Sequence, residues 1–224
     1  MIVDSSALPL RAWTAPTSIE HRTGTIATMG TTLPLRAWTA AEYEQMVAAG
    51  VLGEDDRVEL VEGEIVEMAP VGARHAASVN ALARLLQRQV GDRALVSVQN
   101  PVRLSPRSEP QPDLAVLAWR DDGYRDELPG PADVLLVVEV ADVAEVAEVA
   151  ESSVATDRDV KLPLYGRAGI GEAWLVDLPA GTIEVHTGPS PAGYRERSVH
   201  GIGALVSPVG LVAVVVAVGE AVVA

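Results

Sequence analysis

Cysteine is absent from this chain of 224 residues, which excludes disulfides, thiolate metal sites and cysteine nucleophiles. Its absence fits a reducing compartment. The amino-terminal region lacks a basic segment followed by an apolar core, the pattern of a secretory signal. The longest apolar run, Leu211–Val218, is about half as long as a bilayer span requires, and we predict a buried strand there. We therefore expect a cytoplasmic protein without a membrane segment.

Positive charge is scarce, because 17 lysines and arginines stand against 31 acidic residues and the net charge is −14. Nucleic-acid-binding proteins usually carry a basic surface, since neutralising phosphates releases counterions. Any DNA contact would need local arginine clusters or bound divalent cations to overcome the repulsive field. The chain also has no G-x-S-x-G motif and no P-loop, and its four histidines show no metal-like spacing. Serine and histidine nucleophiles are therefore poor candidates.

Two repeats interrupt an otherwise regular α/β pattern. LPLRAWTA occurs at Leu8–Ala15 and again at Leu33–Ala40, with Met29 upstream of the second copy as an alternative start. We expect residues 1–32 to be a poorly ordered arm and residues 33–224 to be a single domain. The second repeat is VAEVAEVAE at Val143–Glu151, and its alanines and glutamates favour a short exposed helical insertion.

Between the repeats, turn and cap signals separate the expected elements. Thr39 and Glu42 form a capping box before a helix that ends at Gly50, and a hairpin is predicted around Glu62-Gly63. An amphipathic helix is predicted from His75 to Val90. Strands are then predicted at ALVSVQNPVRL, DLAVLAW and DVLLVVEVA, a helix at Asp157–Gly166, strands at EAWLVDL and GTIEVHTG, and more β structure from Tyr194. This order indicates a mixed sheet flanked by helices.

Two carboxylates lie within apolar strands and are the first candidates for chemistry. Glu139 is deep in DVLLVVEVA, and a buried carboxylate is unstable unless it meets a basic side chain, a metal or a proton. A structural ion pair or an edge position is the alternative to a functional role. Asp113 follows Pro112 at the start of DLAVLAW. On neighbouring strands the two acids would repel each other, and a hard divalent cation would resolve that conflict.

A basic residue follows these acids along the chain. Lys161 and Tyr165 are four residues apart and share one helix face. Lys161 could orient a nucleophilic water or stabilise charge on a phosphate, although most lysines simply lie at the surface. Pro163 should bend this helix or lie in its first turn.

The order of six motifs resembles the Uma-type family of putative restriction endonucleases, a large bacterial group with the PD-(D/E)XK fold. The motifs are GEIVEMAP, a glycine loop with His75, QPDLAV, LLVVEVA, DRDVKLPLYGRAGI and EAWLVDL, and the resemblance runs from about Arg36 to the carboxyl terminus. It implies an α/β, restriction-endonuclease-like mixed sheet flanked by helices. An extra N-terminal hairpin and extra C-terminal β structure would complete that fold.

The same resemblance implies a magnesium-dependent site, with manganese as an alternative ion. The metal ligands would be Asp113, Glu139 and Glu64. The family's lysine is absent from the position two residues after the strand glutamate, where Ala141 stands, and would be displaced to Lys161.

His75 would be the family's loop histidine at that site. Its alternative role is a helix cap or a phosphate contact, and Glu64 could be a simple hairpin residue. Tyr165 and Trp174 also match the family pattern and would be core or cleft wall, and Asp177 would be a turn residue.

The leading hypothesis is a metal-dependent endonuclease that hydrolyses DNA, with the formation of a homodimer left open. The alternative is a catalytically silent binding protein that keeps the fold. The acidic charge and the insertion at 143–151 favour the alternative. The insertion could loop out at little entropic cost, or it could misplace Lys161.

Overall fold

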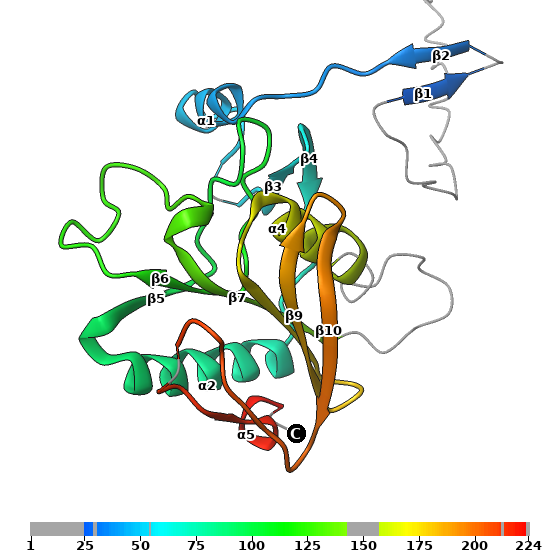
Figure 1. Ribbon diagram of the computed structural model, residues 1–224. Helices are drawn as coiled ribbons and strands as arrows, with labels where there is room; N and C mark the ends of the chain where they lie inside the picture. The colour runs from blue at the N-terminus through cyan, green and yellow to red at the C-terminus, as the bar shows by residue number, and fades with distance from the viewer. Residues whose placement is uncertain (1–24, 29–30, 54, 143–156, 212, 223–224) are drawn as a thin grey trace, which may run out of the picture. The chain divides into compact units, whose positions relative to one another are not determined.

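The computed structural model describes residues 25–28, 31–53, 55–142, 157–211 and 213–222 (Figure 1). The chain divides into two units, Met1–Arg36 and Ala37–Ala224. In the first unit, strands β1 (Thr25–Thr28) and β2 (Thr31–Pro34) pair as an antiparallel hairpin, where the sequence showed no strand period. The rest of the expected arm and the VAEVAEVAE insertion lie outside the described residues.

The second unit is built on a mixed sheet of six strands, in the order β10-β9-β8-β7-β6-β5. Only β7 and β8 are parallel, and every other neighbouring pair is antiparallel. The strands are β5 (Ala94–Val98), β6 (Leu114–Ala118), β7 (Val134–Ala141), β8 (Glu172–Asp177), β9 (Thr182–Ser190) and β10 (Gly193–Gly201). The predicted mixed sheet is confirmed.

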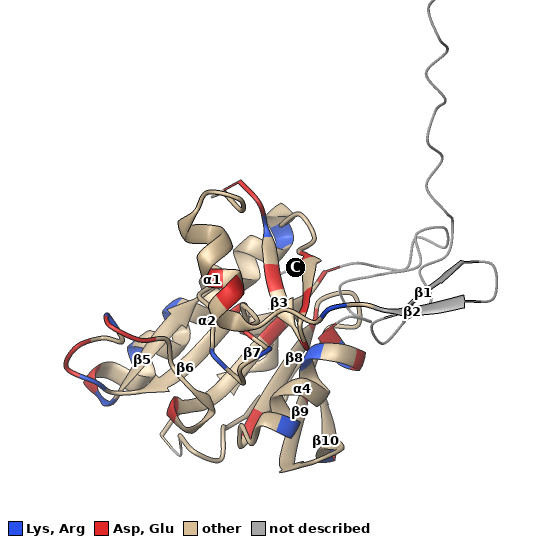
Figure 2. Cartoon of the chain, turned by 90° about the horizontal axis from the view of Figure 1, so that it is seen from above, with Lys and Arg blue, Asp and Glu red and all other residues tan. Residues whose placement is uncertain are grey.

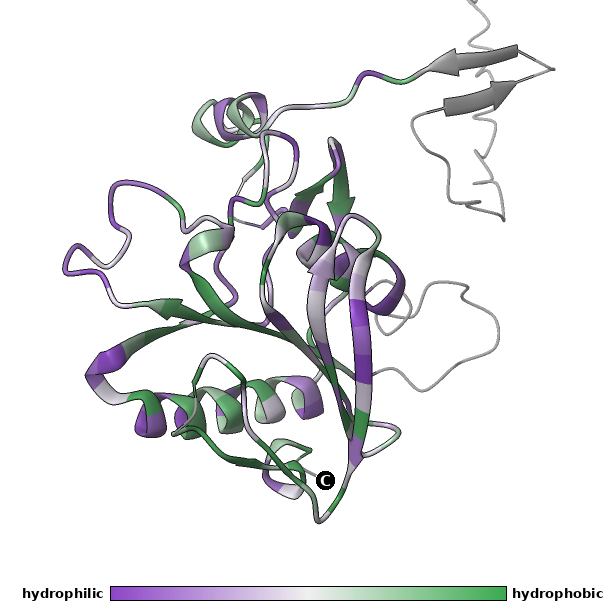
Figure 3. Ribbon diagram, in the orientation of Figure 1, coloured by the Kyte–Doolittle hydropathy of each residue, from purple (hydrophilic) through white to green (hydrophobic). Residues whose placement is uncertain are grey.

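Both faces of this sheet are covered, so its central strands are apolar on both sides. Alternate residues of β7 such as Val138 and Val140 pack toward α2 (Ala73–Val90) and the C-terminal segment, whereas Val137 and Ala141 pack toward α4 (Leu162–Ala168). Figures 1 and 3 show α2 on one face and α4 on the other, with the hydrophobic residues concentrated between the layers.

The two N-terminal helices follow their sequence signals. Thr39 Oγ1 accepts a hydrogen bond of 3.2 Å from Glu42 N, and Thr39 N donates to Glu42 Oε2 at 3.0 Å, which caps α1 (Ala40–Ala48). Helix α2 ends at Val90. Gly91, which has a φ of 54°, begins the 3-10 turn η1 (Gly91–Arg93). No helix within the described ranges combines the length and apolarity needed to cross a bilayer.

The hairpin predicted at Glu62-Gly63 is formed by β3 (Val58–Val61) and β4 (Glu64–Glu67). Glu62 and Gly63 have φ values of 50° and 89°, as a two-residue turn that matches the strand twist requires. Glycine is needed here also because a Cβ on Gly63 would lie 2.7 Å from the Cβ of Ala37.

The prediction of one buried strand over Leu211–Val218 is wrong. Only Val216–Ala217 (β12) is a strand, and its partner β11 (Leu205–Val206) is two residues long; α5 (Val218–Ala221) follows. The amide of Gln89 replaces a strand neighbour, because it donates to Val215 O and accepts from Val215 N, both at 2.7 Å. Val214, Val216 and Val218 of this segment pack into the core, and the homodimer stays a prediction.

The predicted helix at Asp157–Gly166 is present but has two parts. It begins as a π-helical turn, η3 (Asp157–Lys161), and continues as α4, with Pro163 in the first α-helical turn as expected. A proline removes one backbone donor, and wider π turns are frequent at functional sites. The remaining short element, η2 (Pro131–Asp133), leads into β7.

Candidate active site

A cavity of about 510 Å³ lies where β3, β6, β7, the start of α2 and the η3 turn converge. Its wall combines apolar surface with many ionisable side chains, most of which are acidic. The ionisable side chains that line it are Arg57, Glu59, Glu67, His75, Asp113, Glu139, Asp142, Asp157 and Lys161. Four of the five site residues expected from the sequence are therefore together, and Glu64 is not among them.

Asp113 and Glu139 face each other across neighbouring antiparallel strands. Leu114 pairs with Val138, so the next position along places Asp113 opposite Glu139. Asp113 N lies 3.4 Å from Glu139 Oε2, and Asp113 Oδ2 accepts from Val140 N at 2.8 Å. Both side chains are buried and line the same cavity. The juxtaposition that the metal hypothesis required is present.

Two further residues hold the other oxygen of Asp113. His75, in the first turn of α2, has Nε2 2.9 Å from Asp113 Oδ1, and Gln99 Nε2 donates to the same oxygen at 3.2 Å. Gln99 has a φ of 50°, a conformation that costs energy in a residue other than glycine and is common at functional sites. Sequence reasoning missed Gln99, because nothing in VSVQNPV indicates a left-handed residue.

Lys161 is the only lysine among the 17 basic residues of the chain, and it is 7% exposed. Its ammonium lies among three carboxylates, with Nζ at 3.2 Å from Glu59, 3.5 Å from Glu139 and 3.8 Å from Asp157. Lys161 therefore contacts Glu139, although the insertion at 143–151 lies on the connection between these two residues.

Negative charge in this cluster is only partly compensated. Burial raises the pKa of Glu139 well above its ordinary value; Lys161 opposes that shift, while Asp157 and Asp113 reinforce it. Burial likewise raises the pKa of Asp157 to about 7. For Lys161, burial acts to lower the pKa, but the surrounding carboxylates, Glu139 first, raise it above its ordinary value. The lysine stays charged, and one ammonium serves several acids.

The aromatic residues of the family pattern, expected in the core or in a cleft wall, lie in the core and do not line the cavity. Tyr165 is fully buried, and its hydroxyl donates to Glu139 Oε1 at 2.5 Å. Burial raises the pKa of Tyr165 well above its ordinary value, so the hydroxyl keeps its proton. Trp174 donates to Glu172 within the core, and Asp177 accepts from Ala180 N in the turn after β8.

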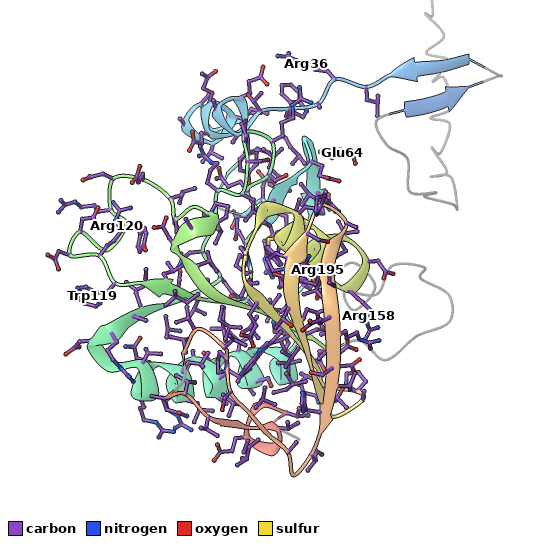
Figure 4. All side chains as sticks on the ribbon, in the orientation of Figure 1. Arg36, Glu64, Trp119, Arg120, Arg158 and Arg195 are labelled. Carbon is purple, nitrogen blue, oxygen red and sulfur yellow. The ribbon has the colours of Figure 1, made fainter. Side chains whose placement is uncertain are left out.

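The β3–β4 hairpin supplies Glu59 to the cavity and not Glu64. Glu64 is exposed beside the turn (Figure 4), outside the cavity lining, and its role as a ligand stays a prediction without structural support. Glu59 is 4% exposed, contacts Lys161 and accepts from Gln111 N at 2.9 Å. The available signal was an acid inside the apolar strand VELV, the same signal that identified Glu139.

The donor set suits a hard cation. Magnesium is typically held by one or two carboxylates, with water and substrate phosphate completing its shell. Within the described ranges, no group of three histidine or acidic side chains is arranged to hold an ion. Asp113 and Glu139 are carboxylates of the type that such an ion prefers, and their role as ligands stays a prediction; Figure 2 shows acidic positions among the strands of the second unit.

Comparisons with known proteins identify the fold and the family. A family model described as "Uma2: Putative restriction endonuclease" matches residues 40–218. A crystal structure of a putative nuclease belonging to DUF820 from Anabaena variabilis superposes with a TM-score of 0.64 at 17% identity, covering 82% of this chain and 97% of that chain, which shows a shared fold. No curated protein matches the chain. The fold is restriction-endonuclease-like, and the chain belongs to the Uma2 family of putative restriction endonucleases.

Proposed function

We propose that this protein is a metal-dependent endonuclease that hydrolyses phosphodiester bonds in DNA at the acidic cavity. The observation that carries the proposal is the meeting of Asp113 and Glu139 on one face of adjacent strands, with the ammonium of Lys161 against Glu139. Membership of a family described as restriction endonucleases supports nucleic acid as the substrate.

Asp113 and Glu139 are the residues that would hold Mg²⁺ or Mn²⁺. A bound ion supplies Lewis acidity toward the phosphate and lowers the pKa of a bound water. It would also offset the repulsion between phosphate and an acidic cavity wall. Glu64 is left out of this ligand set because it does not line the cavity.

The surrounding side chains would orient these groups and the substrate. Lys161 keeps its proton, so its role is to stabilise charge developing on the phosphate and not to act as a base. Tyr165 fixes Glu139, and His75 with Gln99 fixes Asp113. Gly72 and His75 bring the amino-terminal end of the 18-residue helix α2 to the cavity, where the helix dipole favours an anion.

One observation favours the alternative of a silent binding protein. Protein donors or Lys161 already contact both oxygens of Asp113 and both oxygens of Glu139. Such a cluster could be a self-contained structural network. Calorimetry with Mg²⁺ and Mn²⁺ separates the two functions, because the silent protein would bind neither ion at millimolar concentration.

The decisive experiment is cleavage of supercoiled plasmid with Mg²⁺ or Mn²⁺. We expect nicked or linear product from the wild type and a loss of about 10³-fold or more for Asp113→Ala, because a carboxylate ligand contributes several kcal/mol. Asp126→Ala is the matched control, since Asp126 lies in the β6–β7 connection and its side chain is 76% exposed. Equal cleavage by wild type and Asp113→Ala would refute the site.

A further inference from the structure

Lys161 lies at the end of the η3 turn, and its position depends on what holds both ends of that turn. The turn η3 begins at Asp157, directly after the stretch that lies outside the described residues, and Lys161 is its last residue. On its carboxyl side the chain is fixed by α4. There Gly166 and Gly193 meet so closely that a Cβ on Gly166 would lie 2.5 Å from the backbone of Gly193. The question is what fixes the amino-terminal end of the turn.

Arg158 makes that connection, three residues before the lysine. Its Nη2 lies 2.6 Å from Glu184 Oε1 on β9 and 3.3 Å from Asp177 Oδ2 at the end of β8. Figure 4 shows Arg158 on the side of the molecule where β9 and β10 lie. The basic side chains of the turn therefore bind different strands, since Lys161 contacts β3 and β7.

The sheet register shows how the turn is held across the strands. Glu139 pairs with Leu175, and Leu175 pairs with Glu184, so the two glutamates occupy one row with a single strand between them. Two strand spacings separate them, which is about 10 Å. Lys161 binds the first glutamate of the row and Arg158 the second. A turn fixed at both ends of this row has little freedom to move Lys161 away from Glu139.

Glu184 is also held in place by side chains other than Arg158. Arg197 on β10 donates to both oxygens of Glu184, at 2.8 and 2.9 Å, and His186 Nε2 lies 3.3 Å from Oε2. Removing Arg158 would therefore leave Glu184 ionised, paired and in place. Arg197 binds the same carboxylate but does not belong to the turn, which makes it a natural control.

We propose that Arg158 is a positioning residue that holds the ammonium of Lys161 against Glu139 by clamping the η3 turn to Glu184 and Asp177. The placement of Lys161 stands on the contacts alone, and its effect on catalysis rests on the proposed nuclease function. Arg158 itself would not touch the substrate.

The single lysine makes the placement measurable without any activity. Labelling the protein with ¹³C,¹⁵N-lysine gives one set of side-chain NMR signals, all from Lys161. We expect Arg158→Ala to shift or broaden the Cε and Nζ signals. It should also raise the rate of amine acylation at Lys161 by about tenfold or more, as local opening of the turn exposes the ammonium. Arg197→Ala should leave the signals in place and the rate within about twofold.

The activity measurement then tests the catalytic consequence. Arg158→Ala should lower kcat by about 10- to 100-fold with KM within about threefold, because a misplaced group weakens the transition state more than binding. Arg158→Lys should recover part of kcat by restoring a cation on Glu184, and Arg197→Ala should change kcat less than Arg158→Ala does. Arg158→Gln, which keeps an amide donor, replaces the alanine variant if that protein does not fold.

Unchanged lysine signals in Arg158→Ala or Arg158→Gln would overturn the proposal, as would equal shifts in Arg197→Ala. Shifted signals in a protein whose wild type cleaves nothing would instead uphold the clamp and reject the nuclease function. Shifted signals with unchanged kcat in an active enzyme would overturn the catalytic part.

Discussion

Glu139 and Glu184 are the same residue type, each 2% exposed, in the same row of one sheet, yet their electrostatics are opposite. Burial raises the pKa of Glu139 well above its ordinary value. The ammonium of Lys161 opposes this shift only in part, because Glu59 and Asp157 share it. Burial also acts to raise the pKa of Glu184, but Arg197 and Arg158 hold it at about 2. Two differences separate the sites: Glu184 pairs with two arginines, and Glu139 lies deeper within the protein.

This difference indicates where stability and chemistry are located. A buried carboxylate with two arginines is satisfied and needs nothing further. A buried carboxylate that shares one cation with other acids remains short of positive charge. Groups with strongly shifted pKa values in a cavity are candidates for function. The comparison therefore predicts opposite outcomes for the same glutamate-to-glutamine change at the two positions.

The largest effect is expected for Glu139→Gln. Plasmid cleavage should fall by about 10³-fold or more, because the amide is a poor metal ligand. Thermal stability should stay the same or rise by about 2–5 °C, since the variant no longer buries an under-compensated charge. A marked drop in Tm in calorimetric scans would show that Glu139 is a structural ion pair like Glu184.

The next effect concerns the kind of cation that binds Glu139. Lys161→Arg should lower cleavage by about 10²-fold, because a planar guanidinium cannot occupy the compact position of an ammonium among three carboxylates. Arg125→Lys, at a side chain that is 76% exposed, is the control for a basic exchange and should cleave at the wild-type rate. Full activity of Lys161→Arg would mean that only charge is needed there.

The smallest effect is on stability alone. The folded pKa of Glu184 lies below its ordinary value of 4.5, so this carboxylate stabilises the fold above that pH, and its contribution is lost as pH falls toward about 2. Glu184→Gln should lower the free energy of unfolding by roughly 1–2 kcal/mol at pH 7, because solvent screens the partly exposed arginines that pair with this carboxylate. In urea titrations the deficit should shrink below pH 4.5, and a deficit independent of pH would exclude this ionisation as its cause.

The sequence predicts most of the fold because its signals are local. The capping box at Thr39, the Glu62-Gly63 turn and the strands around Asp113 and Glu139 all depend on neighbouring residues. The strand predicted over Leu211–Val218 is shorter in the structure, because Val215 hydrogen-bonds to the side chain of Gln89 on α2, which no local pattern indicates.

The candidate site could be predicted only in part. A buried glutamate lies within or at the start of a strand at Glu59, Glu139, Glu172 and Glu184, and the strand alone does not indicate its partner. Which of them receives arginines, a tryptophan N–H or one shared lysine is decided by contacts between distant segments. Glu64 was predicted from the family resemblance, and Glu59 was missed because its contact with Lys161 joins distant segments.

The parallel pairing of β7 and β8 has a consequence for how this family can vary. Parallel neighbours require a crossover connection, and here that connection begins after Glu139 and ends with the lysine-bearing helix. Each end is secured by its own packing, Glu139 within β7 and Lys161 by the turn and α4. Segments inserted between these anchors, such as the acidic repeat, can therefore accumulate while Lys161 stays in contact with Glu139.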